Sequence, residues 1–585
     1  MENWYIRLMR RCFLWVFCLL LSTTVAPQTV NVPLSHWIYD LLERWETQGY
    51  VENVYDHTKP YSRQEVSEYL VEVIHSYQQS PQSFSSYDLQ YLRYCISEFQ
   101  EELTENGVLT VIPAAENRFQ KIRETPPFSL LPDIVYKNNR NFFSAHFGEF
   151  DLYSDPIFQY STYKTLLNSD TLATVTRWSN GLLFRGNLGK NLGFYFNLTD
   201  NHFSRKPGYP LLQVQEESGF PFVAIHQSKR FDVDENIAYL NLTHKYFSLF
   251  FGRDYNQWGG GHSGQLVLST NSPVYDQIKL TIRYWRFKYT HLTAFLQYIP
   301  PEGRKSIKAF DPIDVYWAGN RLEMYLGRGL QLGLSQTVIY GNQSLKPGYL
   351  NPLAFFKSME HYYGDRDNGA ISIDAVWRVR NGVKIYGEWF IDDLSTTKLG
   401  SDFFGNKFGY QLGVFLVNPL GIPGSDFLVE YTRIKPYVYS HSVQDYNKYK
   451  HYDTILGHAI GPNSDDLLVR YRYAPHRRLR VEFSMENYRH GENPEGENVG
   501  GDPDFPFRFN IDNPSAPFLE GELLTRFLWN MGFRYELLRN TFLLCRVTGI
   551  HSNREGGTTT FFSFRLSYNF GQRPELMPVY QPATR

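Results

Sequence analysis

The residues that could do chemistry gather most densely in the stretch GRDYNQWGGGHSGQLVLSTNSP, residues 252–273. It holds a glycine run, an Arg-Asp pair and a His-Ser pair, the residue types of phosphate-binding and nucleophilic sites. A phosphate-binding loop needs a Lys and a hydroxyl residue directly after its last glycine, but Gln265 and Leu266 follow Gly264. A nucleophile elbow needs G-x-S-x-G, and Ser263 is followed at once by Gly264. Neither motif is complete, so the elements around the stretch must explain it.

Two further sets of ionisable residues have side chains that could transfer a proton or bind a metal. Asp374 and Glu388 face each other in the hairpin predicted below, and such a pair can share a proton in acid–base catalysis. Arginines of the same face, such as Arg378, account for the pair more simply, as part of an ion-paired wall. The other set matches no zinc spacing and consists of His441, His451, Asp453 and His458. The sequence thus predicts no enzyme, no bound metal and no cofactor.

The amino terminus has the three parts of a secretory signal peptide. Arg7, Arg10 and Arg11 form a basic start, an apolar run covers residues 12–21, and the small polar stretch STTVAPQ follows. The run is too short for a membrane-spanning helix, which needs about twenty apolar residues. We therefore expect export through a cleaved signal peptide over residues 1–28.

The rest of the chain is polar on average but rich in aromatic residues. The mean hydropathy is −0.41 and aromatic residues make up 17% of the chain. A transmembrane β-barrel combines these features, because lipid-facing and lumen-facing residues alternate along each strand. A secreted β-sandwich enzyme could show them too. The mature chain keeps only Cys95 and Cys545, which excludes a disulfide framework. Its 58 basic and 60 acidic residues give no support for nucleic-acid binding.

The stretch AISIDAVWRVRNGVKIYGEWF, which begins at residue 370, shows the strand pattern most clearly. A three-residue loop that closes on Gly382 gives the hairpin register with clean faces. The pairs in this register are Val379 with Val383, Trp377 with Ile385, and Ile373 with Trp389. One face is then wholly apolar and holds Ile371, Ile373, Ala375, Trp377, Val379, Val383, Ile385 and Trp389. The other face holds Asp374, Arg378, Lys384 and Glu388.

The same two-faced pattern recurs up to residue 570 and predicts about eighteen antiparallel strands, the first of them at 143–152. An Arg or Lys that faces lipid near the bilayer centre costs about 2 to 4 kcal/mol, so we expect the apolar face outside and the charged face in the lumen. In a soluble barrel or sandwich the apolar face would instead be the core. Short and long connections alternate along the chain. We expect short periplasmic turns and long extracellular loops at 200–234, 340–370, 434–464 and 487–522.

Residues 29–105 predict a small helical periplasmic domain. Apolar residues recur at helical spacing from Leu34 to Trp45, and Ser62 with Glu65 forms a capping box before the next helix. The stretch VPLSHWIYDLLERWETQGYVENVYDHTKPYSRQEV resembles a single S-layer homology repeat, a module that often binds cell-wall polymers. A role as a packing or plug domain is equally open. The remaining predicted divisions are a linker at 106–140, the barrel at 141–570 and a tail at 571–585.

Several blocks of the predicted barrel resemble the Wzi family of outer-membrane capsule assembly proteins. In the first, residues 252–273, a strand is followed by G-R-x-x-x-x-W-G and a leucine-serine step. The others are NRLEMYLGRGLQLGLSQTVIYG (320–341), YLNPLAFF (349–356), and EYTRIKPYVYSH with LGHAIGPNSDD (430–441 and 456–466). The resemblance implies an eighteen-stranded outer-membrane barrel, partly closed by a helical domain. It also implies lectin-like binding of exported capsular or exopolysaccharide, which the protein helps to assemble or anchor at the cell surface.

Such a role needs aromatic faces against sugar C–H surfaces and planar polar groups for the hydroxyls. The predicted outer loops offer three candidate clusters: Arg253, Tyr255, Trp258 and His262; Tyr349, Asn351, His361, Tyr363, Asp365 and Arg366; and Tyr437, Tyr439, His441, His458 and Asn463. The expected partners are the polysaccharide, outer-membrane lipid and periplasmic or export-machinery components, and no nucleic acid. The alternative function is an outer-membrane porin or transporter with an open lumen.

Overall fold

A computed structural model describes most of the chain outside its two ends. The described residues are 30–107, 135–136, 138, 140–167, 170–205, 230–299, 312–444, 446–554 and 558–569. The predicted signal peptide (1–28), most of the predicted linker (106–140) and the predicted tail (571–585) lie outside them.

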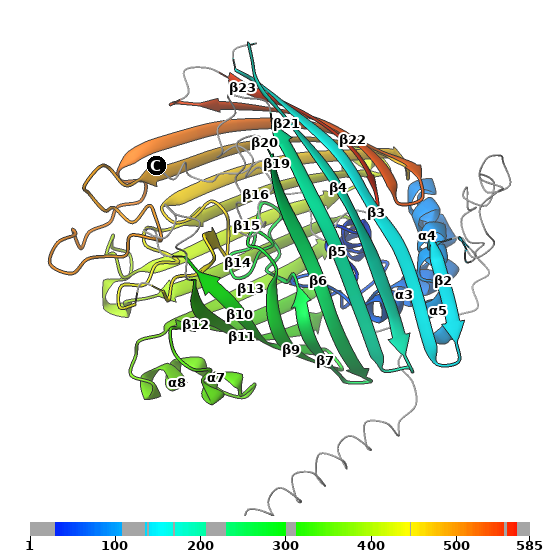
Figure 1. Cartoon of the computed structure of the whole chain (residues 1–585), viewed down its shortest axis with the longest axis horizontal. Helices are drawn as coiled ribbons and strands as arrows, with labels where there is room; N and C mark the ends of the chain where they lie inside the picture. Colours follow the sequence, from blue (N-terminus) through cyan, green and yellow to red (C-terminus); the bar gives the residue numbers. More distant parts are fainter. Residues whose placement is uncertain are drawn as a thin grey trace, which may run out of the picture.

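Eighteen antiparallel strands form a closed barrel, as the alternating pattern predicts (Figure 1). Each strand pairs with its neighbour in the chain, and β23 pairs with β3 to close the ring. The strands are β3 Phe150–Leu167, β4 Asp170–Leu188, β5 Leu192–Arg205, β6 Arg230–His244, β7 Phe247–Asp254, β9 Tyr275–Tyr284, β10 Phe287–Tyr298, β11 Ile313–Gly327, β12 Leu330–Gly341, β13 Asn368–Arg380, β14 Val383–Asp393, β15 Lys407–Val417, β16 Ser425–Ile434, β19 Ser464–His476, β20 Leu479–Glu492, β21 Glu522–Leu538, β22 Thr541–Ser552 and β23 Thr558–Tyr568.

The predicted first strand at 143–152 is wrong in its bounds. The chain turns at Gly148, so that β2 (Phe143–Phe147) forms a hairpin with the first residues of β3, and β3 then runs on to Leu167. The sequence does not indicate this strand clearly, because it contains Pro156. Proline has no N–H to donate to the backbone hydrogen bonds of a sheet and is unusual inside a strand. The strand count is nevertheless the predicted one.

The two predicted faces of the strands point to opposite sides of the barrel wall. Ile373, Trp377 and Trp389 are 48%, 45% and 39% exposed on the outer face. Asp374 and Glu388 face the lumen and are buried. The apolar residues therefore do not lie between two packed sheets, which excludes the soluble sandwich.

The register of the β13–β14 hairpin agrees with the prediction except at its turn. Ile373 pairs with Trp389 and Asp374 with Glu388, but a bulge shifts the last pair so that Arg380, and not Val379, lies opposite Val383. Gly382 has a φ of 83°, the left-handed conformation that the predicted turn requires of a glycine.

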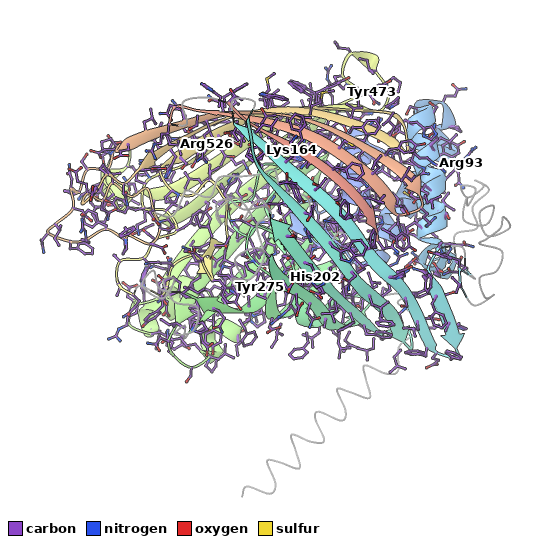
Figure 2. All side chains as sticks on the ribbon, turned by 45° about the horizontal axis from the view of Figure 1, so that its top comes forward. Arg93, Lys164, His202, Tyr275, Tyr473 and Arg526 are labelled. Carbon is purple, nitrogen blue, oxygen red and sulfur yellow. The ribbon has the colours of Figure 1, made fainter. Side chains whose placement is uncertain are left out.

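The two ends of the barrel differ in the length of their connections. At one end, here called the helical end, the strands are joined by short turns at 189–191, 245–246, 285–286, 328–329, 381–382, 418–424, 477–478 and 539–540. The opposite end, called the loop end, carries the longer connections 255–274, 342–367, 394–406, 435–463 and 493–521. In Figure 2, Tyr473 lies at the same end as Arg93 of the helical domain, and Arg526 lies toward the loop end.

The helical domain consists of four α-helices and packs into the helical end of the barrel (Figure 1). Ile38, Leu42 and Trp45 are fully buried in its core. Ser62 caps the second helix as predicted, but Glu65 bonds Lys288 of β10 instead of completing the capping box. The helices are α2 Ile38–Gln48, α3 Arg63–Gln79, α4 Ser86–Glu98 and α5 Gln100–Glu105. Among the described helices, none combines the length and apolar composition needed to cross a bilayer.

Ionic contacts attach this domain to the lumen face of the barrel. Arg44 of α2 pairs with Asp426 of β16, and Arg539 in a short turn pairs with Glu98 of α4. His57 Nδ1 lies 2.6 Å from Asp374 Oδ1 on β13. The domain thus enters the lumen beyond the rim of the barrel, because Asp374 lies six residues from the nearest turn.

Candidate functional site

The stretch at residues 252–273 folds back into the lumen instead of extending from the loop end. Its short strand β8 (Gln257–Trp258) pairs with β1 (Thr58–Lys59) of the helical domain. The Gly259 N–H donates to the His57 carbonyl at 2.9 Å. Trp258 is fully buried against Trp317 of β11, with ring centroids 5.3 Å apart. The stretch therefore bridges the helical domain and the barrel wall; we call residues 255–274 the lumen loop.

The glycine run serves this close packing. A Cβ on Gly260 would lie 2.0 Å from His57 Nε2, and one on Gly264 would lie 2.9 Å from His458. Gly259 also has a φ of 121°, which residues with a side chain rarely adopt. The glycines let the loop pass between the helical domain and the loop at 435–463. They do not form a phosphate cradle.

Ser263, His458 and Glu430 meet inside the lumen in an arrangement that resembles a catalytic triad. Ser263 Oγ donates to Glu430 Oε1 at 2.5 Å and lies 3.1 Å from His458 Nε2. The order of the bonds is nevertheless wrong for a nucleophile. His458 Nδ1 accepts from the Ile460 N–H at 3.3 Å, so Nε2 carries the ring proton and donates to Ser263. Burial lowers the pKa of His458 to about 4, so the ring stays neutral and cannot take the serine proton in this tautomer.

His262 connects the helical domain to the barrel wall. Its Nε2 lies 3.1 Å from Glu43 Oε1 of α2, and its Nδ1 accepts from Arg470 of β19 at 2.9 Å. Glu43 also accepts from Lys384 of β14 at 2.5 Å. Burial opposes ionisation of Glu43, but His262 and Lys384 hold its pKa well below the ordinary value. The carboxylate therefore stays charged and ties three parts of the molecule together.

A cavity of about 610 Å³ lies between the helical domain, the lumen loop and the wall formed by β19–β23 and β3–β6. Asp502 and Asp504 of the 493–521 loop line it at the loop end. Its volume is within the range of small-ligand pockets, about 300 to 1,000 Å³. Its barrel wall carries many charged and hydrogen-bonding side chains. The wall arginines are Arg177, Arg185, Arg470, Arg472, Arg480, Arg534, Arg546 and Arg565, and the wall carboxylates are Asp155, Glu235, Asp466, Glu482 and Glu486.

Charge is distributed unequally between the two sides of the cavity. Asp40 of α2 accepts from Arg480 at 2.6 Å and from Arg472 at 3.1 Å. Burial opposes ionisation of Asp40, yet the two arginines hold its pKa well below the ordinary value. The acidic face of the helical domain thus lies against a basic wall, and this wall also offers planar donors to the cavity.

The first predicted cluster is divided by the wall. Tyr255 is buried and donates to Glu235 at 2.6 Å, and Trp258 is buried beside it in the lumen. His262 lines the cavity. Arg253 lies on the outer face, where it forms a bidentate ion pair with Asp276 of β9 at 2.8 and 2.9 Å. Arg253 therefore does not pair with the neighbouring Asp254, which faces the lumen and accepts from Asn31 of the helical domain.

The second cluster lies in the 342–367 loop, which carries α7 (Pro347–Leu350) and α8 (Phe356–Tyr362). Tyr349 is fully buried and donates to Asp367 at 2.7 Å. Tyr363 is 36% exposed and accepts from the Gly348 N–H. The exposed members are Asn351, His361, Asp365 and Arg366.

The third cluster is mostly internal. Tyr437 and Tyr439 are buried and donate to backbone carbonyls of Asn498 and Leu266. Asn463 bonds the backbone of Gly491, Leu519 and Glu520, and so holds three outer segments together. His441 is partly exposed and bonds the Arg366 carbonyl at 3.1 Å, and His458 lines the cavity. Within the described part of the chain, no group of His, Cys, Asp and Glu residues has the geometry of a metal site.

The wall arginines are the site residues that the sequence prediction missed. Arg470, Arg472 and Arg480 alternate with apolar residues along two strands, so the sequence assigns them to the lumen face. The prediction looked for ligand contacts only in the loops. The signal was present in the alternation, but the cavity beside these arginines depends on how far the helical domain fills the lumen.

A protein-family model for the capsule assembly protein Wzi matches residues 134–536, more than half of the chain. The chain belongs to the Wzi family. Wzi from Escherichia coli, whose structure has been solved, is an outer membrane protein involved in group 1 capsule assembly and a carbohydrate-binding β-barrel. It is similar over 93% of this chain and 100% of its own, with a TM-score of 0.54 and 14% identity. At this identity the likeness shows the fold.

Other solved structures are also similar, with lower TM-scores. OccK8 (OprE) of Pseudomonas aeruginosa matches 71% of this chain and 97% of its own, with a TM-score of 0.42 and 10% identity. The comparison with curated proteins finds no matching sequence.

Proposed function

We propose that this Wzi family member resides in the outer membrane, binds exported capsular or exopolysaccharide and helps to assemble or anchor it at the cell surface. The observation that carries the proposal is the cavity beneath the outer loops, whose barrel wall carries arginines and carboxylates. Guanidinium and carboxylate groups are planar and bond sugar hydroxyls and acidic sugar groups well. The role is lectin-like and does not involve catalysis, which the tautomer of His458 beside Ser263 supports.

Two groups of the predicted residues suit this role. His262 and His458 line the cavity, while Asn351, His361, Tyr363, Asp365, Arg366 and His441 offer polar or aromatic groups at the loop end. Arg253 remains a candidate on the outer face. The others, Tyr255, Trp258, Tyr349, Tyr437, Tyr439 and Asn463, are buried and would act by holding the loops in place. For these residues to meet exported polysaccharide, the loop end must face the cell exterior.

The porin alternative conflicts with the filled lumen. The helical domain is inserted from one end and the lumen loop from the other, and the two pair through β1 and β8. A barrel with such contents should pass little ionic current across a planar bilayer. An open-channel conductance of the purified protein would favour the porin.

The chain divisions remain part of the proposal. They are a signal peptide at 1–28, a helical domain at 29–105, a linker at 106–140, the barrel at 141–570 and a tail at 571–585. We propose that the helical domain is a plug, because its ionic residues bond the lumen wall. The likeness of its first part to an S-layer homology repeat stays a prediction, as do contacts with export machinery.

Deletion of the gene, followed by measurement of cell-associated and released polysaccharide, tests the function. We expect polysaccharide to move from the cell-associated to the released fraction. Unchanged retention would overturn the proposal.

Two matched variants test the cavity. Arg534 and Arg526 lie on the same face of β21, but only Arg534 lines the cavity. We expect Arg534→Gln to weaken binding of purified polysaccharide several-fold in titration calorimetry and Arg526→Gln to leave it unchanged. Equal effects of the two variants would show that the cavity is not the binding site. The function itself would still be tested by the gene deletion.

A further inference from the structure

The segment at 347–363 follows the wall strand β12 and packs on the outside of the barrel. Figure 1 shows α7 and α8 beside the loop-end portion of β12, apart from the loops that enter the lumen. Outward-facing residues of β11 and β12, namely Ala318, Val338 and Tyr340, are fully buried against Tyr349 and Phe356 of this segment. The segment therefore covers a part of the wall whose other outward residues face lipid.

Beneath the segment, three polar residues form a row across the outer face. His291 pairs with Asn320, and Asn320 pairs with Gln336, so the row crosses β10, β11 and β12. His291 Nδ1 lies 2.6 Å from Asn320 Oδ1. Polar side chains on the lipid face need partners, because lipid tails offer none. This row finds them in the segment itself.

The backbone of the segment is in turn satisfied by the row. Asn320 Nδ2 and Gln336 Nε2 donate to the Ala354 carbonyl at 3.2 and 2.8 Å, and the Phe356 N–H donates to Gln336 Oε1 at 2.9 Å. Tyr289 of β10 donates to the Pro352 carbonyl. Irregular backbone at membrane depth is tolerated only where protein groups bond it in this way. The row and the segment thus form a matched pair on the outer wall.

Side chains of the segment alternate between the wall and the surroundings. Ala354 and Phe356 are buried on the barrel, whereas Leu353 and Phe355 point away and are 91% and 55% exposed. Soluble surfaces rarely present large apolar residues together in this way. Leu353 and Phe355 thus form an apolar surface on the outside of the segment, above the part of the barrel wall that the segment covers.

This new surface continues the apolar outer face of the barrel. Leu322, Leu334 and Ile373 form the adjacent cross-strand row toward the helical end, and they are 41%, 51% and 48% exposed. Successive outward rows are about 7 Å apart, because the strand rises about 3.3 Å per residue. Leu353 and Phe355 therefore adjoin the surface that contacts lipid acyl chains.

We propose that residues 347–363 form a membrane-interface element, in which Leu353 and Phe355 insert into the acyl chains of the outer leaflet at the rim of the barrel. The ligand class is membrane lipid, and the element fixes the depth and tilt of the barrel on the side of β10–β13. This inference depends on the membrane-spanning barrel and not on polysaccharide binding. It gives Leu353 and Phe355 of the YLNPLAFF block a role other than contact with sugar.

Site-specific quenching in vesicles tests the proposal. The full mature chain carries Cys95→Ser and Cys545→Ser, and single cysteines are introduced at Leu353 or Phe355 and labelled with bimane. Leu334→Cys is the control for a lipid-facing position, and Glu495→Cys, in an exposed loop, is the control for an aqueous one. Each protein is reconstituted in phosphatidylcholine–phosphatidylglycerol vesicles that contain no polysaccharide, and its heat-dependent gel shift confirms folding.

We expect nitroxide-bearing acyl chains to quench the labels at L353C and F355C as strongly as at L334C and several-fold more than at E495C. Aqueous iodide should show the opposite order. Iodide quenching at L353C and F355C equal to that at E495C would overturn the proposal. So would efficient disulfide formation between L353C of two chains in the vesicles, which would make a second copy the occupant. Shielding from iodide only after polysaccharide is added would overturn it in favour of a sugar contact.

Discussion

The lumen loop (255–274) and the outer-wall segment (347–363) begin alike and end on opposite sides of the barrel wall. Each follows a strand at the loop end, and each combines aromatic, histidine and asparagine residues. The lumen loop turns inward and pairs with β1 of the helical domain. The outer-wall segment turns outward and packs on Ala318, Val338 and Tyr340.

The difference lies in the partners that each segment finds. Inside, the lumen loop meets carboxylates such as Glu430, which accepts from the backbone of His262 and Ser263 at 2.7 Å. Outside, the segment meets an apolar wall and a single polar row, and it presents Leu353 and Phe355 to the surroundings. The barrel wall separates the polar lumen from the apolar surroundings of the outer face. A loop of mixed composition therefore packs on the side where its groups find matching partners.

Replacement of Trp258 by Ala should have the largest effect on this comparison. The ring is fully buried in the lumen, so its removal leaves a cavity and should lower the free energy of unfolding by about 3 to 5 kcal/mol. Urea titration in detergent, followed by the heat-dependent gel shift, measures the change. Leu353→Ala is the control on the other segment, because its side chain is 91% exposed to the surrounding lipid or detergent and its removal leaves no cavity inside the protein. Equal effects of the two variants would contradict the assignment of one segment to a packed interior.

Replacement of Glu43 by Gln tests the ionic attachment of the helical domain to the lumen. One partner of a buried, paired charge is then lost, which costs about 3 kcal/mol. Burial opposes ionisation of Glu43, but His262 and Lys384 lower its folded-state pKa well below 4.5. Its contribution to stability is thus present above pH 4.5 and lost as the pH falls below that value toward the folded-state pKa.

The measurement for Glu43→Gln is the difference in unfolding free energy from the native protein at about pH 7 and about pH 3. The difference should be large at the higher pH and shrink at the lower one. Glu52→Gln is the control, because the Glu52 side chain is 51% exposed in its pair with Arg378. A difference that grows on acidification would show that Glu43 is not ionised in the folded state.

Replacement of Gln336 by Ala tests how the outer-wall segment is attached to the barrel. The change leaves the Phe356 N–H without its acceptor and removes a donor from the Ala354 carbonyl, which should cost about 1 to 3 kcal/mol. The loosened segment should be cut faster by trypsin after Lys357 in folded protein. Leu334→Ala lies on the same face of β12, makes no bond to the segment and should not change the rate. Unchanged proteolysis in Gln336→Ala would contradict the role of the polar row.

Replacement of Arg253 by Ala should have the smallest effect. Its side chain is 40% exposed and lies one residue from the loop end of β7, where solvent at the rim screens its pair with Asp276, so the pair contributes about 0 to 1 kcal/mol. A double-mutant cycle with Asp276→Ala measures the coupling. A coupling as large as the Trp258 effect would mean that this exposed pair helps to position the lumen loop that follows it.

Local periodicity accounts for the parts of the fold that were predicted correctly. The β13–β14 hairpin was predicted with its faces and most of its register, because alternation and the turn at Gly382 are both local signals. Most of β3, from residue 153 onward, was missed, since Pro156 and the polar residues that follow it interrupt the alternation. Of the candidate site residues, His262 and His458 line the cavity, and the wall arginines beside them were missed.

By itself the sequence determined that the strands have one apolar and one charged face, because the two-residue period of a strand relates neighbouring positions, and it favoured a barrel over a sandwich. Only the tertiary structure decided which loops enter the lumen, which one lies on the outer wall and where a cavity remains. Those outcomes depend on contacts such as Gly259 with His57 and Ala354 with Asn320. Their partners lie on other elements and have no periodic relation in the sequence, so no local pattern could indicate them.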